Sequence, residues 1–143
     1  MKMSKTNLLP DLLLRRKNRR ANAKMLQIDS PNGITENRFV TIGGIEQWVT
    51  IRGEDRRLPV LLFIHGGPAS PYSIFNPLLR SWEKRFTLVQ WDQRGAGKTF
   101  RKNGKAASGI ITLDRLARDG IELTEYLRDR LGHRKIILIG SSV

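Results

Sequence analysis

The final residues of the sequence carry the pattern of a serine nucleophile. Gly-Ser-Ser-Val (140–143) directly follows the apolar run Ile-Ile-Leu-Ile (136–139). A strand followed by Gly-x-Ser-x gives four of the five positions of Gly-x-Ser-x-Gly, a turn that holds a nucleophilic serine on a tight corner above a sheet. In this register Ser142 is the nucleophile and Ser141 is the intervening residue. The alternative interpretation is a polar tail with no chemical role.

A second stretch has the residues to stabilise a negative charge. His-Gly-Gly-Pro (65–68) follows another apolar run, Val-Leu-Leu-Phe-Ile (60–64). Gly66 and Gly67 leave their backbone N–H groups unshielded by side chains, and such donors can hold a developing oxyanion. Because Gly-Gly-Pro is also a common turn, this pattern is not specific by itself.

A third stretch, Gln-Trp-Asp-Gln-Arg-Gly-Ala-Gly-Lys-Thr (90–99), ends like a phosphate-binding loop. That motif needs a glycine five positions before Gly97, where this chain has Asp92. It also needs a helix that begins at the Lys-Thr pair, whereas the polar residues 100–105 predict a loop. No second acidic strand for magnesium is evident. Nucleotide binding is therefore not expected here.

The same stretch is better explained as a structural turn. A strand that ends at Asp92 must turn sharply, and Gly95 and Gly97 permit the positive φ that such a turn requires. Asp92 and Arg94 are close enough in sequence to pin the turn by a charge-assisted hydrogen bond. Ligands bind at the carboxyl ends of parallel strands, so the turn can also border a site.

The surrounding sequence predicts the elements that must position these stretches. Runs 38–42 and 45–51 flank Gly43-Gly44 and predict a hairpin. Apolar runs predict buried strands at 60–64 and 136–139, and the similar stretch 88–91, which contains Gln90, predicts a third. Helices are expected at about 73–85 and at 113–131, the latter capped by Thr112 and ended by Gly132. This order predicts an α/β fold, an antiparallel hairpin followed by parallel strands with flanking helices.

Composition narrows the chemistry further. The 143 residues contain no cysteine, which excludes disulfides, thiolate zinc sites and cysteine nucleophiles, and a cytoplasmic location fits. No run is long and apolar enough for a membrane span. The net charge is +13, and residues 1–24 hold eight basic side chains and one acid. This basic leader could contact nucleic acid or anionic lipid, although a solvated leader is the more common case.

Taken together, the three stretches resemble the α/β-hydrolases, and within them the proline iminopeptidase-like group. The resemblance is carried by His-Gly-Gly-Pro (65–68), Trp-Asp-Gln-Arg-Gly-Ala-Gly-Lys-Thr (91–99) and Gly-Ser-Ser (140–142), and it covers about residues 38–143. It implies the amino-terminal half of a mostly parallel, eight-stranded domain that hydrolyses a small-molecule or peptide substrate through an acyl-enzyme. No cofactor or metal is implied. The group usually has glycine at the place of Ala69 and tryptophan at the place of Val143.

The resemblance also implies a role for each site residue. Ser142 would attack the substrate, and the N–H groups of Val143 and of the Gly66-Gly67 loop would form the oxyanion hole. His65 would belong to the oxyanion loop and would not be the general base.

The acid and the histidine that complete such a triad follow the nucleophile in this family. His133 is expected at the amino end of the last strand, the end opposite Ser142. The sequence therefore predicts a basic leader and linker over 1–36 and an amino-terminal half-domain over 37–143 that is inactive by itself. The alternative is a non-catalytic basic fragment that binds nucleic acid or a partner chain.

Overall fold

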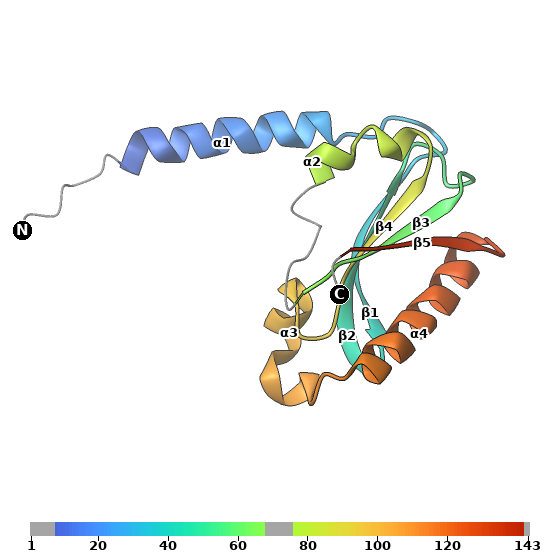
Figure 1. The fold of residues 1–143 in the computed structure, drawn as a ribbon. Helices are drawn as coiled ribbons and strands as arrows, with labels where there is room; N and C mark the ends of the chain where they lie inside the picture. The colour runs from blue at the N-terminus through green and yellow to red at the C-terminus, as the bar shows by residue number, and fades with distance from the viewer. Residues whose placement is uncertain (1–7, 68–75, 142–143) are drawn as a thin grey trace, which may run out of the picture.

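One mixed sheet organises the part of the chain that the computed structural model describes, residues 8–67 and 76–141. Its strand order is β1-β2-β4-β3-β5 (Figure 1). The strands are β1 (Ile34–Ile42), β2 (Ile45–Gly53), β3 (Val60–Ile64), β4 (Thr87–Asp92) and β5 (Ile136–Gly140). β2 runs antiparallel to β1 and β4, whereas β3 runs parallel to β4 and β5. The predicted α/β class, with a hairpin before parallel strands, is confirmed.

The hairpin turns at the two glycines that the sequence indicated. Gly43 has a φ of 56° and Gly44 a φ of 77°, and Ile42 pairs with Ile45 across the turn. Both values lie in the left-handed region, which glycine adopts without the steric cost of a Cβ. The strands continue beyond the predicted ranges at the open end of the hairpin.

The helices differ in how well the sequence predicted them. They are α1 (Leu8–Met25), α2 (Asn76–Leu79), the short 3₁₀ helix η2 (Trp82–Lys84), α3 (Gly97–Ser108) and α4 (Leu113–Leu131). α4 matches its prediction, because the Thr112 side chain accepts a hydrogen bond from the Arg115 N–H at 3.1 Å and Gly132 ends the helix in the left-handed conformation.

Two local expectations are wrong. The helix expected at 73–85 is instead two short pieces, α2 and η2, in its described part, and residues 73–75 lie outside the described residues. The interruption lets Glu83 turn inward to the buried Arg52. The loop expected at 100–105 lies within α3. Residues 8–25 of the leader, where no helix was predicted, form the helix α1, and its side chains from residue 14 to residue 25 are exposed, as expected for a solvated leader.

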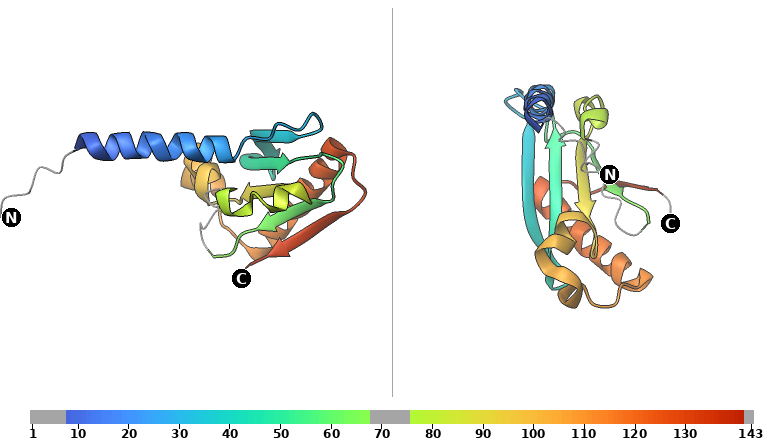
Figure 2. Two further views of the ribbon diagram at one scale, coloured as in Figure 1. Left: turned by 90° about the horizontal axis from the view of Figure 1, so that it is seen from above. Right: turned by 90° about the vertical axis from the view of Figure 1, so that its left-hand side faces the viewer.

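Helices cover both faces of the sheet (Figure 2). Leu123 and Leu127 of α4 belong to one buried cluster with Val89 and Trp91 of β4. Neighbouring β4 residues point to the other face, since side chains alternate along a strand. There the Asp92 carboxylate accepts a hydrogen bond from α3. All six residues of β4 are buried, the polar Thr87, Gln90 and Asp92 included, as expected for a strand that is covered on both faces.

Candidate active site

The carboxyl ends of β3 and β5 lie side by side. Ile64, the last residue of β3, pairs with Gly140, the last residue of β5. The Ser141 N–H then donates a hydrogen bond to the Ile64 carbonyl at 3.2 Å. Ser141, the residue before Ser142, therefore lies next to the start of the glycine loop. Ser142 and Val143 themselves lie outside the described residues.

Gly66 and Gly67 continue from β3 at this same edge of the sheet. Gly67 has a φ of 56° and is exposed, and a Cβ placed on it would meet no atom of the described residues within 4 Å. Its left-handed backbone lets the chain leave the strand abruptly, which a residue with a side chain rarely does. Both predicted oxyanion glycines therefore follow the strand end that lies next to Ser141.

His65 is fixed by a residue to which the sequence analysis gave no role. The backbone N–H of Gln93 donates to His65 Nε2 at 3.2 Å, and the Gln93 side-chain amide donates to the His65 carbonyl at 2.6 Å. Both residues are buried. This reciprocal contact ties the glycine loop to the turn after β4. The available signal was the position of Gln93, a polar side chain directly after a buried strand.

Burial decides the protonation state of this histidine. Loss of water around the ring lowers the pKa of His65 below its ordinary value, and the contact with Gly66 and the charge of Asp92 only partly oppose this. The hydrogen bond from the Gln93 N–H also requires a neutral ring, because Nε2 needs its lone pair to accept that bond. His65 is thus a neutral loop residue, and the Nε2 lone pair that a general base would use already accepts a hydrogen bond from Gln93.

Asp92 holds the start of α3. Its carboxylate accepts a hydrogen bond from the Lys98 N–H at 2.8 Å, and its carbonyl accepts one from the Thr99 hydroxyl. The helix that a phosphate site requires is therefore present, so that argument against nucleotide binding was wrong. However, a carboxylate already occupies the amino end of this helix, where a phosphate would bind. Gly95 and Gly97 have φ values of 79° and 48°, which confirms the predicted positive φ at both.

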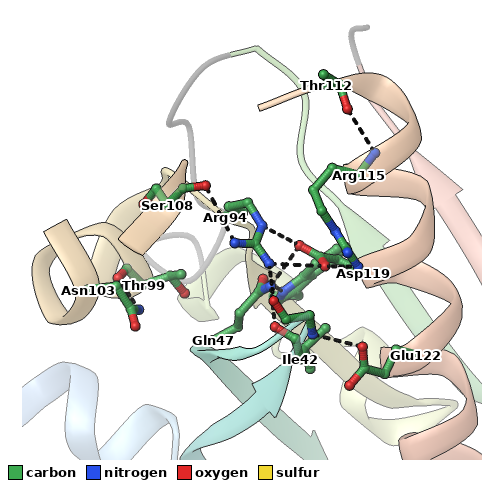
Figure 3. Close-up of polar contacts among 12 residues, drawn as sticks. Ile42, Gln47, Arg94, Thr99, Asn103, Ser108, Thr112, Arg115, Asp119 and Glu122 are labelled. Carbon is green, nitrogen blue, oxygen red and sulfur yellow. Dashed lines mark hydrogen bonds and ion pairs between the residues drawn. The ribbon is translucent and has the colours of Figure 1, made fainter. Parts of the chain in front are cut away.

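Arg94 pairs with a different carboxylate from the one expected (Figure 3). Its Nε donates to Asp119 Oδ2 of α4 at 2.8 Å, and its Nη2 donates to the Gly43 carbonyl at 2.7 Å. Asp119 is fully buried and also accepts from Gln47 at 2.9 Å and pairs with Arg115 at 2.7 Å. The expected pair of Arg94 with Asp92 is thus replaced by a network that joins the hairpin turn to α4. The partner lies 25 positions away in sequence, which local spacing could not reveal.

His133 lies where the sequence placed it, away from these strand ends. It precedes β5, and its Nε2 is 3.1 Å from the Arg56 carbonyl. Among the described residues, no group of three histidine or acidic side chains could hold a metal ion. None of the described helices is long and apolar enough to cross a membrane.

Comparison with known proteins identifies the arrangement. Residues 59–143, the part that holds β3 to β5 and all the site stretches, match the alpha/beta hydrolase fold family. The chain belongs to the alpha/beta hydrolase family. A probable aminopeptidase of Bacillus subtilis (strain 168) is 34% identical over 116 residues, which are 80% of this chain and 36% of that protein. The proline iminopeptidase of Lactobacillus delbrueckii subsp. lactis is 29% identical over 110 residues, which are 76% of this chain and 35% of that protein.

Solved structures agree with this family assignment. The proline iminopeptidase-related protein from Thermus thermophilus superposes with a TM-score of 0.59 at 26% identity, over 75% of this chain and 36% of that one. The resemblance to proline iminopeptidases is therefore confirmed. This alpha/beta hydrolase chain spans just over a third of the length of the relatives it matches.

Proposed function

We propose that this chain carries the nucleophile and the oxyanion-stabilising loop of a serine hydrolase with aminopeptidase-like specificity. Ser142 is the nucleophile in this proposal, and the backbone N–H groups of Val143 and of the Gly66-Gly67 loop are the oxyanion donors. The observation that supports it is the pairing of Ile64 with Gly140, which brings Ser141, the residue before Ser142, next to the start of the glycine loop. The aminopeptidase and proline iminopeptidase relatives support a peptide substrate with a free amino terminus.

The chemistry follows from this placement. The Ser142 hydroxyl oxygen attacks the carbonyl carbon of the scissile bond, and the carbonyl oxygen becomes an oxyanion between the backbone donors. Each such donor is worth about 3–4 kcal/mol in a working site. Collapse of the tetrahedral species expels the amine and leaves an acyl-enzyme, which water then hydrolyses. The serine proton must pass to a base and then to the leaving amine.

Neither histidine of the chain fits the role of that base. His65 uses Nε2 to accept from Gln93 and is buried. His133 lies before β5, and the five-residue strand separates it from Ser141 by about 16 Å at about 3.3 Å per residue. Serine without a base is a weak nucleophile at neutral pH. We therefore propose that the 143 residues alone do not turn over substrate at an enzyme-like rate.

A chimera with the Bacillus subtilis relative tests the nucleophile. This chain is joined to the part of that aminopeptidase beyond the matched region, and hydrolysis of aminoacyl p-nitroanilides is measured. We expect turnover by the chimera, none by the unfused chain, and a loss of at least about a thousandfold on Ser142→Ala. Ser141→Ala is the matched control and should stay within about tenfold of the parent chimera. A folded but inactive chimera, or an active Ser142→Ala variant, would contradict the proposal.

A further inference from the structure

The strongest feature outside the hydrolase site is the charge of α1. Six cationic side chains lie between residues 15 and 24, and no acidic residue occurs between Asp11 and Asp29. Every side chain from residue 14 to residue 25 is exposed. None of the six cations forms an ion pair with a described residue. They are Arg15, Arg16, Lys17, Arg19, Arg20 and Lys24.

This helix carries its charge without a partner that offsets it. Arg15 and Arg19, like Arg16 and Arg20, are four positions apart and therefore neighbours on the helix surface, where like charges destabilise a helix. Because its side chains are exposed from residue 14 to residue 25, the helix obtains little stability from packing along that length. A polyanion along the helix would relieve this repulsion.

The structure nevertheless holds one end of α1 in place. Arg80 donates from Nε to the Met25 carbonyl at 3.1 Å and from Nη2 to the Gln27 carbonyl at 3.0 Å. Arg52 donates to the Leu26 carbonyl and forms an ion pair with the buried Glu83. The rest of the helix projects away from the sheet (Figures 1 and 2). The anchored end thus presents the charged length of α1 to the surroundings.

The distribution of the charges distinguishes between kinds of polyanion. At 100° per residue, the six cations cover an arc of about 200°. The leucines at 8, 9, 12 and 13 fall on the same arc, and the opposite side mixes apolar residues with asparagines, so the sequence gives no continuous apolar face. A helix that lies on a membrane needs such a face. Residues 1–38 contain no aromatic side chain, so the helix also lacks a platform on which single-stranded bases could stack.

We propose that α1 is a binding helix for duplex DNA. The major groove of B-form DNA admits an α-helix, and cations spread over much of the helix surface meet phosphates on both walls of the groove. The deep, narrow major groove of duplex RNA does not admit side chains in this way. The helix is about 27 Å long, enough to follow roughly eight base pairs. Binding is driven by phosphates and does not depend strongly on sequence.

The test is the salt dependence of binding by the full chain to a fluorescent DNA duplex of about 20 base pairs. If six phosphates are contacted, the plot of log K against log salt has a slope of about −5, and affinity falls roughly a thousandfold from about 50 to about 200 mM salt. Glutamine at positions 15, 16, 19 and 20 removes four charges while keeping helix propensity. For this variant the expected slope is about −2.

The matched control removes the same net charge elsewhere. In this control, glutamine replaces four exposed cationic residues outside α1: Lys84, Arg85, Arg101 and Lys105. Its slope should stay near −5, and circular dichroism checks the fold of both variants. A second variant, Asn18→Pro, keeps every charge but breaks the helix, and should bind the duplex more weakly than the parent chain.

Several results would overturn the proposal. Equal loss of binding in the α1 variant and the control would show that net charge alone drives binding. Undiminished binding by Asn18→Pro would exclude a helix in a groove. Tighter binding to duplex RNA, or to vesicles rich in phosphatidylglycerol, would assign α1 to a different partner.

Discussion

His65 is a residue whose chemistry in this fold differs from what its type suggests. Histidine is a common general base, but here both ring nitrogens lie among contacts that hold the glycine loop. Gln93 supplies the opposing contacts from the turn after β4. The family resemblance implied that His65 belongs to the loop, whereas only the three-dimensional contacts identify Gln93 as the residue that holds it.

The lowered pKa of His65 predicts a pH dependence of stability. The unfolded chain titrates near the ordinary value of about 6.5, so between the two pKa values the unfolded state binds more protons. The contribution of His65 to the free energy of unfolding is then complete above about pH 6.5 and decreases as the pH falls below this value. We expect the urea midpoint to drop between about pH 7.5 and about pH 5.5, and to drop less in His65→Gln. Equal drops in both proteins would contradict this account.

At the scale of elements, the hairpin turn, the β4 turn and α4 are held together by Arg94 and Asp119. The guanidinium reaches Asp119 on α4, the Gly43 carbonyl in the hairpin turn and the Ser108 carbonyl at the end of α3. Because the Asp119 side chain is fully buried, loss of Arg94 leaves a carboxylate that water cannot solvate and that keeps only Arg115 and Gln47 as partners.

Removal of Arg94 should therefore be costly. We expect Arg94→Ala to lower the free energy of unfolding by about 3–5 kcal/mol, as when one partner of a buried ion pair is removed. The matched control is Arg118→Ala, which breaks the exposed pair with Asp114 at 2.9 Å and should cost less than about 1 kcal/mol. Urea unfolding measures both variants. Similar values for the two would mean that the buried network contributes little.

The elements also show what the sequence could and could not predict. α4 was predictable because its leucines recur at helical spacing between Thr112 and Gly132. The helix α3 was missed because it is mostly polar, and Gly104 interrupts it with a φ of 71°. The partner of Arg94 could not be predicted, since Asp119 is brought near only when α4 packs on the sheet.

At the scale of the whole molecule, β5 forms an edge of the sheet within the described residues. It pairs with β3 alone, and its Ile137 and Leu138 side chains are 46% and 53% exposed. An apolar edge of this kind is a template for further strand pairing. The apolar run at 136–139 predicts this strand from the sequence. Its pairing with β3 is visible only in the folded structure.

The proposed placement of residue 142 beside the glycine loop can be tested directly by disulfide cross-linking, because the chain contains no cysteine. A Gly66→Cys, Ser142→Cys double variant is oxidised, and bond formation is followed by mobility on a non-reducing gel. Gly66 is used because Gly67 has a φ of 56°, which strains any other residue. Disulfides need Cα atoms within about 7 Å.

The control pair is Lys135→Cys with Ser142→Cys, because residue 135 precedes β5 and residue 142 follows it. The account predicts rapid, complete cross-linking of the 66–142 pair and none of the 135–142 pair. If the 66–142 pair fails to cross-link while the chain is folded, Ser142 does not lie at the glycine loop and the proposed hydrolase site is wrong.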